Sequence, residues 1–185
     1  KAKGVHAGLA VILVGSDPAS QVYVGQKKKA CEEVGIQSFE RVLPANASHD
    51  DVAAVIREMN ANKNVHGILM QLPLPSHLNA DPLIQMIDPD KDVDGLTVLS
   101  AGRLFSGLDG LVPCTPQGSL ILIKSVQPDL TGLNAVVIGR SLLFGKPMGQ
   151  LLLAENCTVT QAHSKTKNLP DICRNADILV AAVGR

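Results

Sequence analysis

The sequence predicts an α/β protein with two domains, each built on a parallel-type sheet with flanking helices. Short, β-branched apolar runs alternate with helical patterns along most of the chain. Glycine and proline mark the boundaries between these runs. Repeated strand–helix units of this kind favour parallel strands that are joined by right-handed crossovers.

The first elements alternate as strand and helix. Residues 8–15, GLAVILVG, form a short apolar run bounded by glycine, which predicts a buried strand. A helix is predicted next, over residues 18–34. Asp17 suits its N-cap, Pro18 its first position and Gly35 its C-terminal end. The following elements are a strand at 38–43, a helix at 50–60 after the N-cap Ser48, a strand at 65–72 and a helix at 81–87.

The second half continues this pattern after a change of domain. Its predicted elements are loops at 89–96 and 111–118, a helix at 118–126, and strands at 133–139, 157–162 and 176–183. The domain change is expected near Pro113 to Pro116, which gives domains of residues 1–116 and 117–185. The chain starts at Lys1 without Met and stops directly after an apolar run. We therefore expect further residues at both ends and an incomplete second sheet.

Composition excludes several classes of function. The 17 basic and 17 acidic residues cancel, so the chain has no general electrostatic attraction to nucleic acid or anionic membranes. No apolar run reaches the roughly 18 to 20 residues of a transmembrane helix. The 4 cysteines and 5 histidines show no CxxC, HExxH or other ligand spacing. We therefore expect idle thiols in a reducing compartment and no bound metal.

The stretch SQVYVGQKKKA, residues 20–30, is the first candidate for chemistry. Tyr23 and Lys27 are four residues apart and share one face of the predicted helix, a pairing suited to proton transfer. Tyr23 is the only tyrosine, so no other phenol can replace it. Lys28 and Lys29 crowd Lys27 with positive charge, which favours its unprotonated, proton-accepting form. A surface helix with a solvated basic run is the alternative, and it stays open here.

The stretch GRSLLFGKP, residues 139–147, indicates a nucleotide site. Gly139 follows a predicted strand and Gly145 is near the next helix start, so a pyrophosphate could approach the backbone there. The spacing is GxSxxxGxP rather than GxGxxG, and a tight turn that serves packing alone is the alternative. As a nucleotide site, this unit makes the second domain Rossmann-like. Short-chain dehydrogenases also contain Tyr-x-x-x-Lys, but their glycine turn precedes the tyrosine, whereas Tyr23 precedes Gly139.

The strand after the glycine turn favours NADP over NAD. A NAD site usually has a carboxylate at the end of its second strand, where it binds the ribose hydroxyls. Here that end reads QAHSKTK, with His163, Ser164 and Lys165 but no acid. Arg140 lies in the glycine turn itself, and such positive and hydroxyl groups suit a 2′-phosphate. A solvated basic loop is the alternative.

Polar residues also follow the carboxyl ends of the first-domain strands, which is where parallel sheets bind ligands. Tyr23 and Lys27 follow the first strand, and Gln71 ends the third. Asp92 and Asp94 lie in the next loop, where a carboxylate could bind the adjacent N–H donors of a pterin-like ring. Loop capping is the alternative for Asp92.

Five motifs occur in the order YVGQK, QLPLP, PDKDVDG, PCTP and GRSLLFGKP over nearly the whole chain. In this respect the chain resembles the bifunctional methylenetetrahydrofolate dehydrogenase/cyclohydrolases. The resemblance implies NADP-dependent oxidation of 5,10-methylenetetrahydrofolate and hydrolysis of the methenyl product to 10-formyltetrahydrofolate. It also implies a cytoplasmic homodimer of one-carbon metabolism and purine biosynthesis. A non-catalytic nucleotide- or folate-binding module is the alternative, and the retention of Tyr23 and Lys27 speaks against it.

The same resemblance implies roles for single residues. Tyr23 would stack on the folate and shape its site, and Lys27 would be the catalytic lysine. Gln71 would hydrogen-bond that lysine and adjust it for proton transfer, and Asp94 would hold the pterin. The NADP contacts would be Gly139, Arg140, Ser141 and Ser164. Phe144 departs from the family, which commonly has valine there, and we expect it to tighten the turn.

Overall fold

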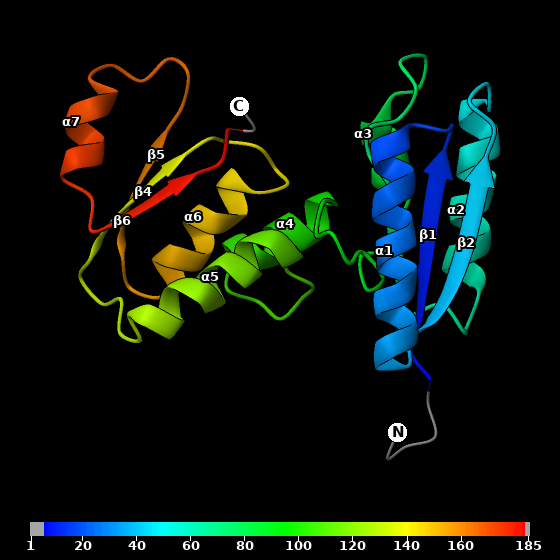
Figure 1. Cartoon of the computed structure of the whole chain (residues 1–185), viewed down its shortest axis with the longest axis horizontal. Helices are drawn as coiled ribbons and strands as arrows, with labels where there is room; N and C mark the ends of the chain where they lie inside the picture. The colour runs from blue at the N-terminus through cyan, green and yellow to red at the C-terminus, as the bar shows by residue number, and fades with distance from the viewer. Residues whose placement is uncertain (1–5, 184–185) are drawn as a thin grey trace. The chain divides into compact units, whose positions relative to one another are not determined.

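The computed structural model describes residues 6–183, and its two compact units divide between Val93 and Asp94 (Figure 1). Each unit has a three-stranded parallel sheet with helices beside it. The α/β fold class predicted from the sequence is confirmed. Within residues 6–183, no helix combines the length and the apolar character that crossing a membrane requires.

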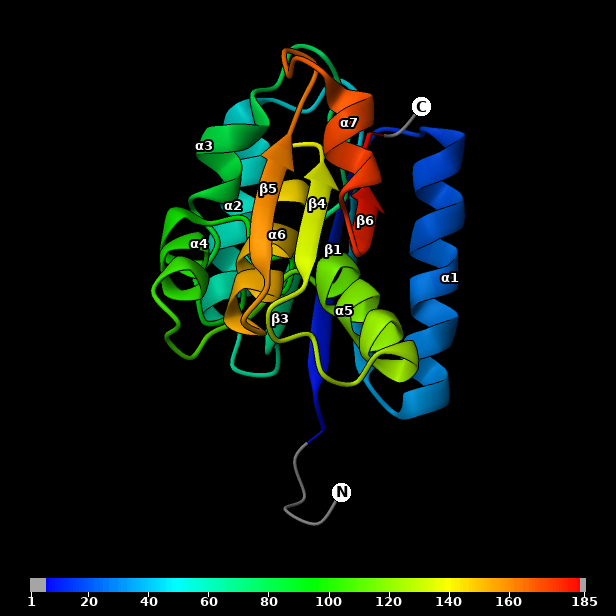
Figure 2. The same ribbon diagram turned by 90° about the vertical axis from the view of Figure 1, so that its left-hand side faces the viewer.

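The first unit contains the strand–helix alternation predicted for it. Its elements are β1 (Gly8–Val14), α1 (Pro18–Val34), β2 (Gln37–Leu43), α2 (His49–Ala61), β3 (Gly67–Met70) and α3 (Ala80–Ile84). The sheet order is β2-β1-β3, so the chain moves out from β1 to β2 and then returns past β1 to β3. Right-handed crossovers in opposite directions put α1 and α2 on opposite faces of this sheet (Figures 1 and 2). Val11 and Leu13 of β1 pack with Val24 of α1, which fixes the helix against the sheet.

The ends of α1 lie where the capping residues predict them. Asp17 accepts hydrogen bonds of 2.8 Å from both the backbone N–H and the hydroxyl of Ser20, and Pro18 is in the first turn. Gly35 closes the helix at φ 76°, a left-handed conformation that glycine adopts without a Cβ clash.

The second unit contains the predicted strand, glycine turn and helix. Its elements are α4 (Val98–Phe105), α5 (Cys114–Val126), β4 (Asn134–Ile138), α6 (Gly145–Ala154), β5 (Thr158–Ala162), α7 (Leu169–Arg174) and β6 (Ile178–Ala181). The sheet order is β5-β4-β6, with α6 packed on the sheet and with α4 and α5 packed on α6 (Figure 1). Val137 of β4 and Met148 and Leu152 of α6 form the centre of its core.

Several helices differ from the sequence prediction. α5 starts at Cys114 rather than near 118, because Pro116 lies in its first turn, where the missing N–H costs no hydrogen bond. α4 was not predicted, and the apolar side chains at its two ends, Val98 and Phe105, are 76% and 74% exposed. α7 has only 6 residues, too few to show a helical period, and α3 ends at Ile84 rather than 87.

The division between the compact units comes earlier in the chain than the domain change expected near residues 113–116. Residues from Asp94 onward cluster with the second unit, to which α4 belongs through its packing on α6. A division into compact units does not show which residues bind folate and which bind NADP. The functional domains 1–116 and 117–185 therefore stay a prediction.

Candidate active site and cofactor site

The predicted lysine and glutamine meet in the first unit. Lys27 Nζ donates a hydrogen bond of 2.9 Å to Gln71 Oε1. Gln71 follows β3 directly, and its backbone N–H donates to Ile12 O at 2.8 Å, next to the paired strands. Its amide nitrogen donates to Leu72 O at 2.8 Å, so the amide oxygen is the atom that faces Lys27. The hydrogen bond implied by the family resemblance is confirmed.

Tyr23 lies one helical turn before Lys27 on α1, as the spacing predicts. Tyr23 is 59% exposed, whereas the adjacent Val24 is 7% exposed and packs on the sheet. The phenol ring therefore lies at the surface of the helix, one turn from the partly buried Lys27. An exposed ring in this position is able to stack on a planar ligand.

Other polar residues of α1 have structural partners. Lys28 Nζ lies 3.3 Å from Glu40 Oε1, so part of the charge expected to crowd Lys27 is paired. Ser20 is buried and donates its hydroxyl to Asp17. Hydrogen bonds from the Ser20 backbone N–H and then from its hydroxyl hold the pKa of the Asp17 carboxyl below its ordinary value. Lys27 is thus the lysine of this run whose hydrogen bond reaches a strand end.

The two candidate aspartates of the loop after α3 lie in different surroundings. Asp92 is 1% exposed and forms an isolated parallel bridge with Ile68 of β3. Asp94 is only partly buried and is the first residue of the second unit. The burial of Asp92 agrees with a part in the fold of the loop, whereas the partly buried Asp94 stays the predicted pterin-binding carboxylate.

Sequence reasoning missed Lys91, which precedes these aspartates. Its Nζ donates to the carbonyl oxygens of Met59, Asn60 and Asn62 at the C-terminal end of α2, at 3.2, 2.7 and 3.0 Å. These partners precede Lys91 by 29 to 32 residues. Because no local pattern connects residues at that separation, only the motif around Lys91 marks it in the sequence.

The glycine turn after β4 requires the absence of two side chains. Gly139 has φ 126°, and a Cβ there would lie 2.3 Å from Ala182 O. A Cβ on Gly145 would lie 2.4 Å from Gly139 O. The Ser141 hydroxyl accepts hydrogen bonds from the backbone N–H groups of Phe144 and Gly145, at 3.2 and 3.4 Å. Close backbone packing therefore explains both glycines.

The predicted cofactor residues line one cavity of about 420 Å³ in the second unit. Its described wall consists of Ile138, Gly139, Arg140, Ser141, His163, Ser164, Leu169, Ala182 and Val183. This wall has a guanidinium, an imidazole and two hydroxyls but no carboxylate, which suits an anionic phosphate. Lys165 is not among these wall residues, so only part of the predicted basic loop faces the cavity.

Gln161 of β5 links this turn to the neighbouring strand, and the sequence does not indicate it. Its amide nitrogen donates a hydrogen bond to Gly139 O. A Cβ on Gly149 of α6 would lie 2.9 Å from Gln161 Oε1, so that glycine leaves room for the amide. Phe144, the departure from the family, is the N-cap residue of α6 and packs against the core of the unit.

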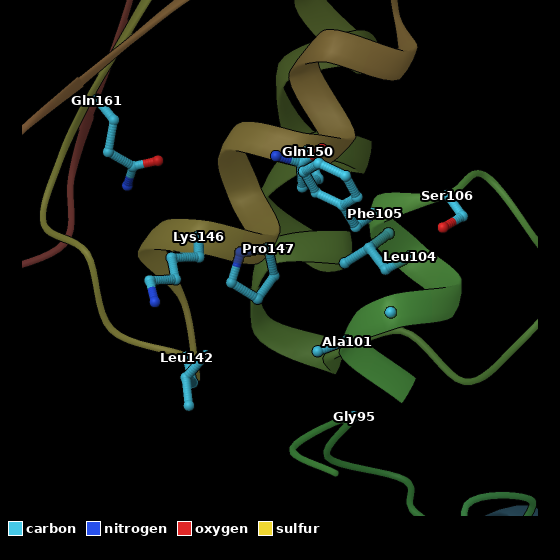
Figure 3. Close-up of a pocket in the computed structure, with 11 residues that line it drawn as sticks. Gly95, Ala101, Leu104, Phe105, Ser106, Leu142, Lys146, Pro147, Gln150 and Gln161 are labelled. Atoms are coloured by element: carbon cyan, nitrogen blue, oxygen red, sulfur yellow. The ribbon is translucent and has the colours of Figure 1, made fainter. Parts of the chain in front are cut away.

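A second cavity of about 420 Å³ lies between α4 and α6 of the same unit (Figure 3). Its apolar wall includes Leu104 and Phe105 of α4 and Pro147 of α6, and Lys146 and Gln161 supply polar groups. The residues predicted to bind folate or NADP do not line it. Gln161 belongs to this wall and also bonds Gly139, so it connects the second cavity with the glycine turn.

Thiols and possible metal ligands are scattered over the described part of the chain. Among residues 6–183, no three His, Cys, Asp or Glu side chains gather as a metal site would require. The four cysteines are free thiols. Burial raises the pKa of the Cys31 and Cys157 thiols, and the charges of Glu32 and Glu155 add to the rise. A raised pKa disfavours the reactive thiolate at both positions.

Two models of one protein family match this chain. Residues 1–94 match the catalytic domain of tetrahydrofolate dehydrogenase/cyclohydrolase. Residues 113–185 match the NAD(P)-binding domain of tetrahydrofolate dehydrogenase/cyclohydrolase. The segment that bears Tyr23, Lys27, Gln71 and Asp94 thus falls in the first match, and the glycine turn in the second.

Individual relatives agree with these matches. The bifunctional protein FolD of Sphingopyxis alaskensis is 60% identical over 184 residues, which cover 100% of this chain and 61% of the relative. The FolD methylenetetrahydrofolate dehydrogenase/cyclohydrolase structure from Campylobacter jejuni has a TM-score of 0.96 at 46% identity, covering 99% of this chain and 65% of that one. The Trypanosoma brucei FolD structure, complexed with NADP and an inhibitor, has a TM-score of 0.92 at 35% identity. The match covers 99% of this chain and 63% of that one. The chain therefore spans about three fifths of the length of the curated relative.

Proposed function

Because the chain belongs to the tetrahydrofolate dehydrogenase/cyclohydrolase family, we propose that it acts in one-carbon metabolism on tetrahydrofolate derivatives. It oxidises 5,10-methylenetetrahydrofolate with NADP and hydrolyses the methenyl product to 10-formyltetrahydrofolate. The observation that supports this most is the hydrogen bond between Lys27 and Gln71, one helical turn from the exposed Tyr23. That bond joins residues 44 positions apart in the chain at the carboxyl end of a parallel strand, which is the usual location of ligands.

Lys27 serves as the base of the hydrolytic reaction in this proposal. An unprotonated lysine amine has two N–H donors and one lone pair, and donation of one N–H to Gln71 leaves the lone pair for water. Water adds to the methenyl carbon and gives a proton to Nζ. The bond from this carbon to the ring nitrogen then breaks as that nitrogen takes up a proton, and loss of the hydroxyl proton leaves the formyl group.

Tyr23 and Asp94 bind the folate in this proposal. The exposed Tyr23 ring stacks on the ring system, and its π-face favours the delocalised cation of the methenyl form. Asp94 accepts hydrogen bonds from adjacent N–H groups of the pterin, a paired arrangement that suits a carboxylate. Gln71 keeps Lys27 oriented through the observed hydrogen bond.

The cavity at the glycine turn binds NADP in this proposal. Gly139, Arg140, Ser141 and Ser164 hold the cofactor, since the wall combines cationic and hydroxyl groups with a turn that brings backbone to the surface. When bound, NADP accepts a hydride from the methylene carbon. The Arg140 guanidinium pairs with the 2′-phosphate, a group that NAD lacks. The Trypanosoma brucei relative, whose structure holds NADP, supports this choice of cofactor.

The partners and location follow from the family resemblance. We propose a homodimer that works in the cytoplasm and supplies 10-formyltetrahydrofolate to purine biosynthesis. Size-exclusion chromatography with light scattering tests the oligomeric state, and a monomer at all concentrations contradicts it. Fractionation of the source cells tests the compartment.

Two assays on the intact protein test the catalytic proposal. Near-ultraviolet absorbance follows NADPH formation from methylenetetrahydrofolate and NADP, and the loss of methenyltetrahydrofolate absorbance follows hydrolysis. Both reactions are expected, and both should depend on enzyme concentration. Binding of folate and NADP without turnover in either assay supports the non-catalytic module instead.

A further inference from the structure

We propose that Lys91 is a positioning residue for the Asp94 carboxylate. This inference rests on the proposed function, in which Asp94 holds the pterin. Lys91 does not contact the ligand in this proposal. Its side chain binds the C-terminal end of α2 and so holds in place the segment that carries Asp94.

The ammonium group of Lys91 is fully engaged. Its Nζ has three carbonyl partners, Met59 O, Asn60 O and Asn62 O, at 3.2, 2.7 and 3.0 Å. These carbonyls belong to the last turn of α2 and its C-cap, where a helix carries partial negative charge. Met59 O and Asn62 O also accept hydrogen bonds from the backbone N–H groups of Asn62 and Val65. A cation with three donors is thus the matching partner for this helix end.

The loop before Lys91 is tied to the same helix end. The Asn60 side-chain nitrogen donates to Met86 O at 2.7 Å, and Asn60 Oδ1 accepts from the backbone N–H of Asp88 at 2.9 Å. The backbone N–H of Lys91 donates to Asp88 O at 2.8 Å. The segment therefore reaches Lys91 already anchored on α2.

The segment after Lys91 is held against β3. Ile68 of β3 donates its backbone N–H to Lys91 O at 2.7 Å and forms the bridge with Asp92. A Cβ on Gly67 would lie 2.6 Å from Val93 Cγ1, so that glycine admits Val93 close to the strand. Asp94 is the next residue, and successive Cα atoms are only about 3.8 Å apart. The hydrogen bonds of Lys91 consequently restrict the position of the Asp94 backbone.

Loss of the Lys91 ammonium should weaken folate binding through Asp94. Lys91→Met keeps most of the side-chain length but leaves the three carbonyls without this donor. We expect the KM for methylenetetrahydrofolate to rise about 10-fold, within the range of coupling in one hydrogen-bond network. The KM for NADP and kcat should change much less, because neither involves Asp94.

A double-mutant cycle in the intact protein separates positioning from general structural damage. The variants are Lys91→Met, Asp94→Asn and their combination. Asp94→Asn alone should weaken folate binding strongly and leave NADP binding nearly unchanged. If Lys91 acts through Asp94, Lys91→Met should add little to the folate KM in the Asp94→Asn background. A full 10-fold further rise in that background overturns the inference.

Two further variants complete the test. Lys63→Met is the matched control, since Lys63 is an exposed lysine in the α2–β3 connection, and its folate KM should equal that of the wild type. Lys91→Arg retains a multidentate donor and should restore most of the affinity. Lys91→Gln, whose amide group keeps two N–H donors, replaces Lys91→Met in the cycle if thermal unfolding shows that the methionine variant does not fold. Absence of folate binding and turnover in the wild type would instead reject the proposed function.

Discussion

The two units build their candidate sites from different parts of the chain. In the first unit the chemistry lies in side chains, with Lys27 on a helix hydrogen-bonded to Gln71 at a strand end. In the second unit the backbone forms the site, at a turn where neighbouring backbone atoms leave no room for a Cβ on Gly139 or Gly145. A site of the first kind can lose its chemistry and keep its fold. A site of the second kind cannot change at its glycines without a change in the fold.

The sharpest test of this comparison is Lys27→Met, which keeps the side-chain stem and deletes the base. Hydrolysis of methenyltetrahydrofolate should fall by about 10² to 10⁴-fold, the usual worth of general acid–base help. Dehydrogenase activity should remain measurable, because hydride transfer depends mainly on orientation of the two substrates. Lys29→Met is the control on the exposed side of the same helix. Hydrolysis at the wild-type rate would remove Lys27 from the mechanism.

The matching test in the second unit is Gly139→Ala. A Cβ at φ 126° and 2.3 Å from Ala182 O requires the backbone to move. The free energy of unfolding should fall by about 3 kcal/mol, the upper range for such strain, and NADP affinity should fall with it. Denaturant unfolding and a cofactor titration measure the two effects. Gly118→Ala in α5 meets nothing within 4 Å and should not destabilise, so similar losses in both variants would break the comparison.

Arg140→Ala tests what a side chain contributes to the cofactor site at the glycine turn. Losing one charge-assisted contact with the 2′-phosphate should cost about 1.5 to 3 kcal/mol, or roughly 10- to 150-fold in NADP affinity. NAD affinity should change little, and thermal stability should stay near that of the wild type because Arg140 is exposed. Titrations of both proteins with both cofactors measure this. Equal affinity of the wild type for NAD and NADP would contradict the assignment.

The smallest effect is expected at Asp17, the N-cap residue of α1, the helix that carries Tyr23 and Lys27. Hydrogen bonds from Ser20 lower the pKa of Asp17 in the folded state. The stabilisation is therefore present above the unfolded pKa of about 3.9 and is lost as the pH falls through the lower folded pKa. Asp17→Asn retains a capping oxygen but carries no titrating proton. Urea unfolding between about pH 5 and pH 2 should show a shallower loss of stability in the variant, and parallel pH profiles would contradict this.

The accuracy of the sequence prediction depends on how local the relevant signal is. α1 begins at Pro18 and ends at Val34 as predicted, since Asp17 and Gly35 act on the helix ends beside them. The start of α5 at Cys114 was harder to predict, because proline in a first turn resembles proline in a loop. α4 has only 8 residues and was not predicted, and the apolar side chains at its two ends are exposed.

The candidate sites divide in the same way. The shared face of Tyr23 and Lys27 follows from a spacing of four residues, and the glycine turn follows from glycine between a strand and a helix. The partner of Lys27 entered only through a family resemblance, because 44 residues separate it from Gln71. The hydrogen bond from Gln161 to Gly139 O also has no local signal, since it crosses between neighbouring strands.

The sequence by itself therefore determined the α/β class, the caps of α1 and the residue types that carry chemistry. Short-range sterics and hydrogen bonds act over a few residues, so local patterns report them. Only the tertiary structure decided that Lys27 reaches Gln71 and that Lys91 reaches the end of α2. Such contacts depend on the strand order β2-β1-β3 and on the face of the sheet that each crossover takes. Those are properties of the whole unit, and no segment of the chain encodes them alone.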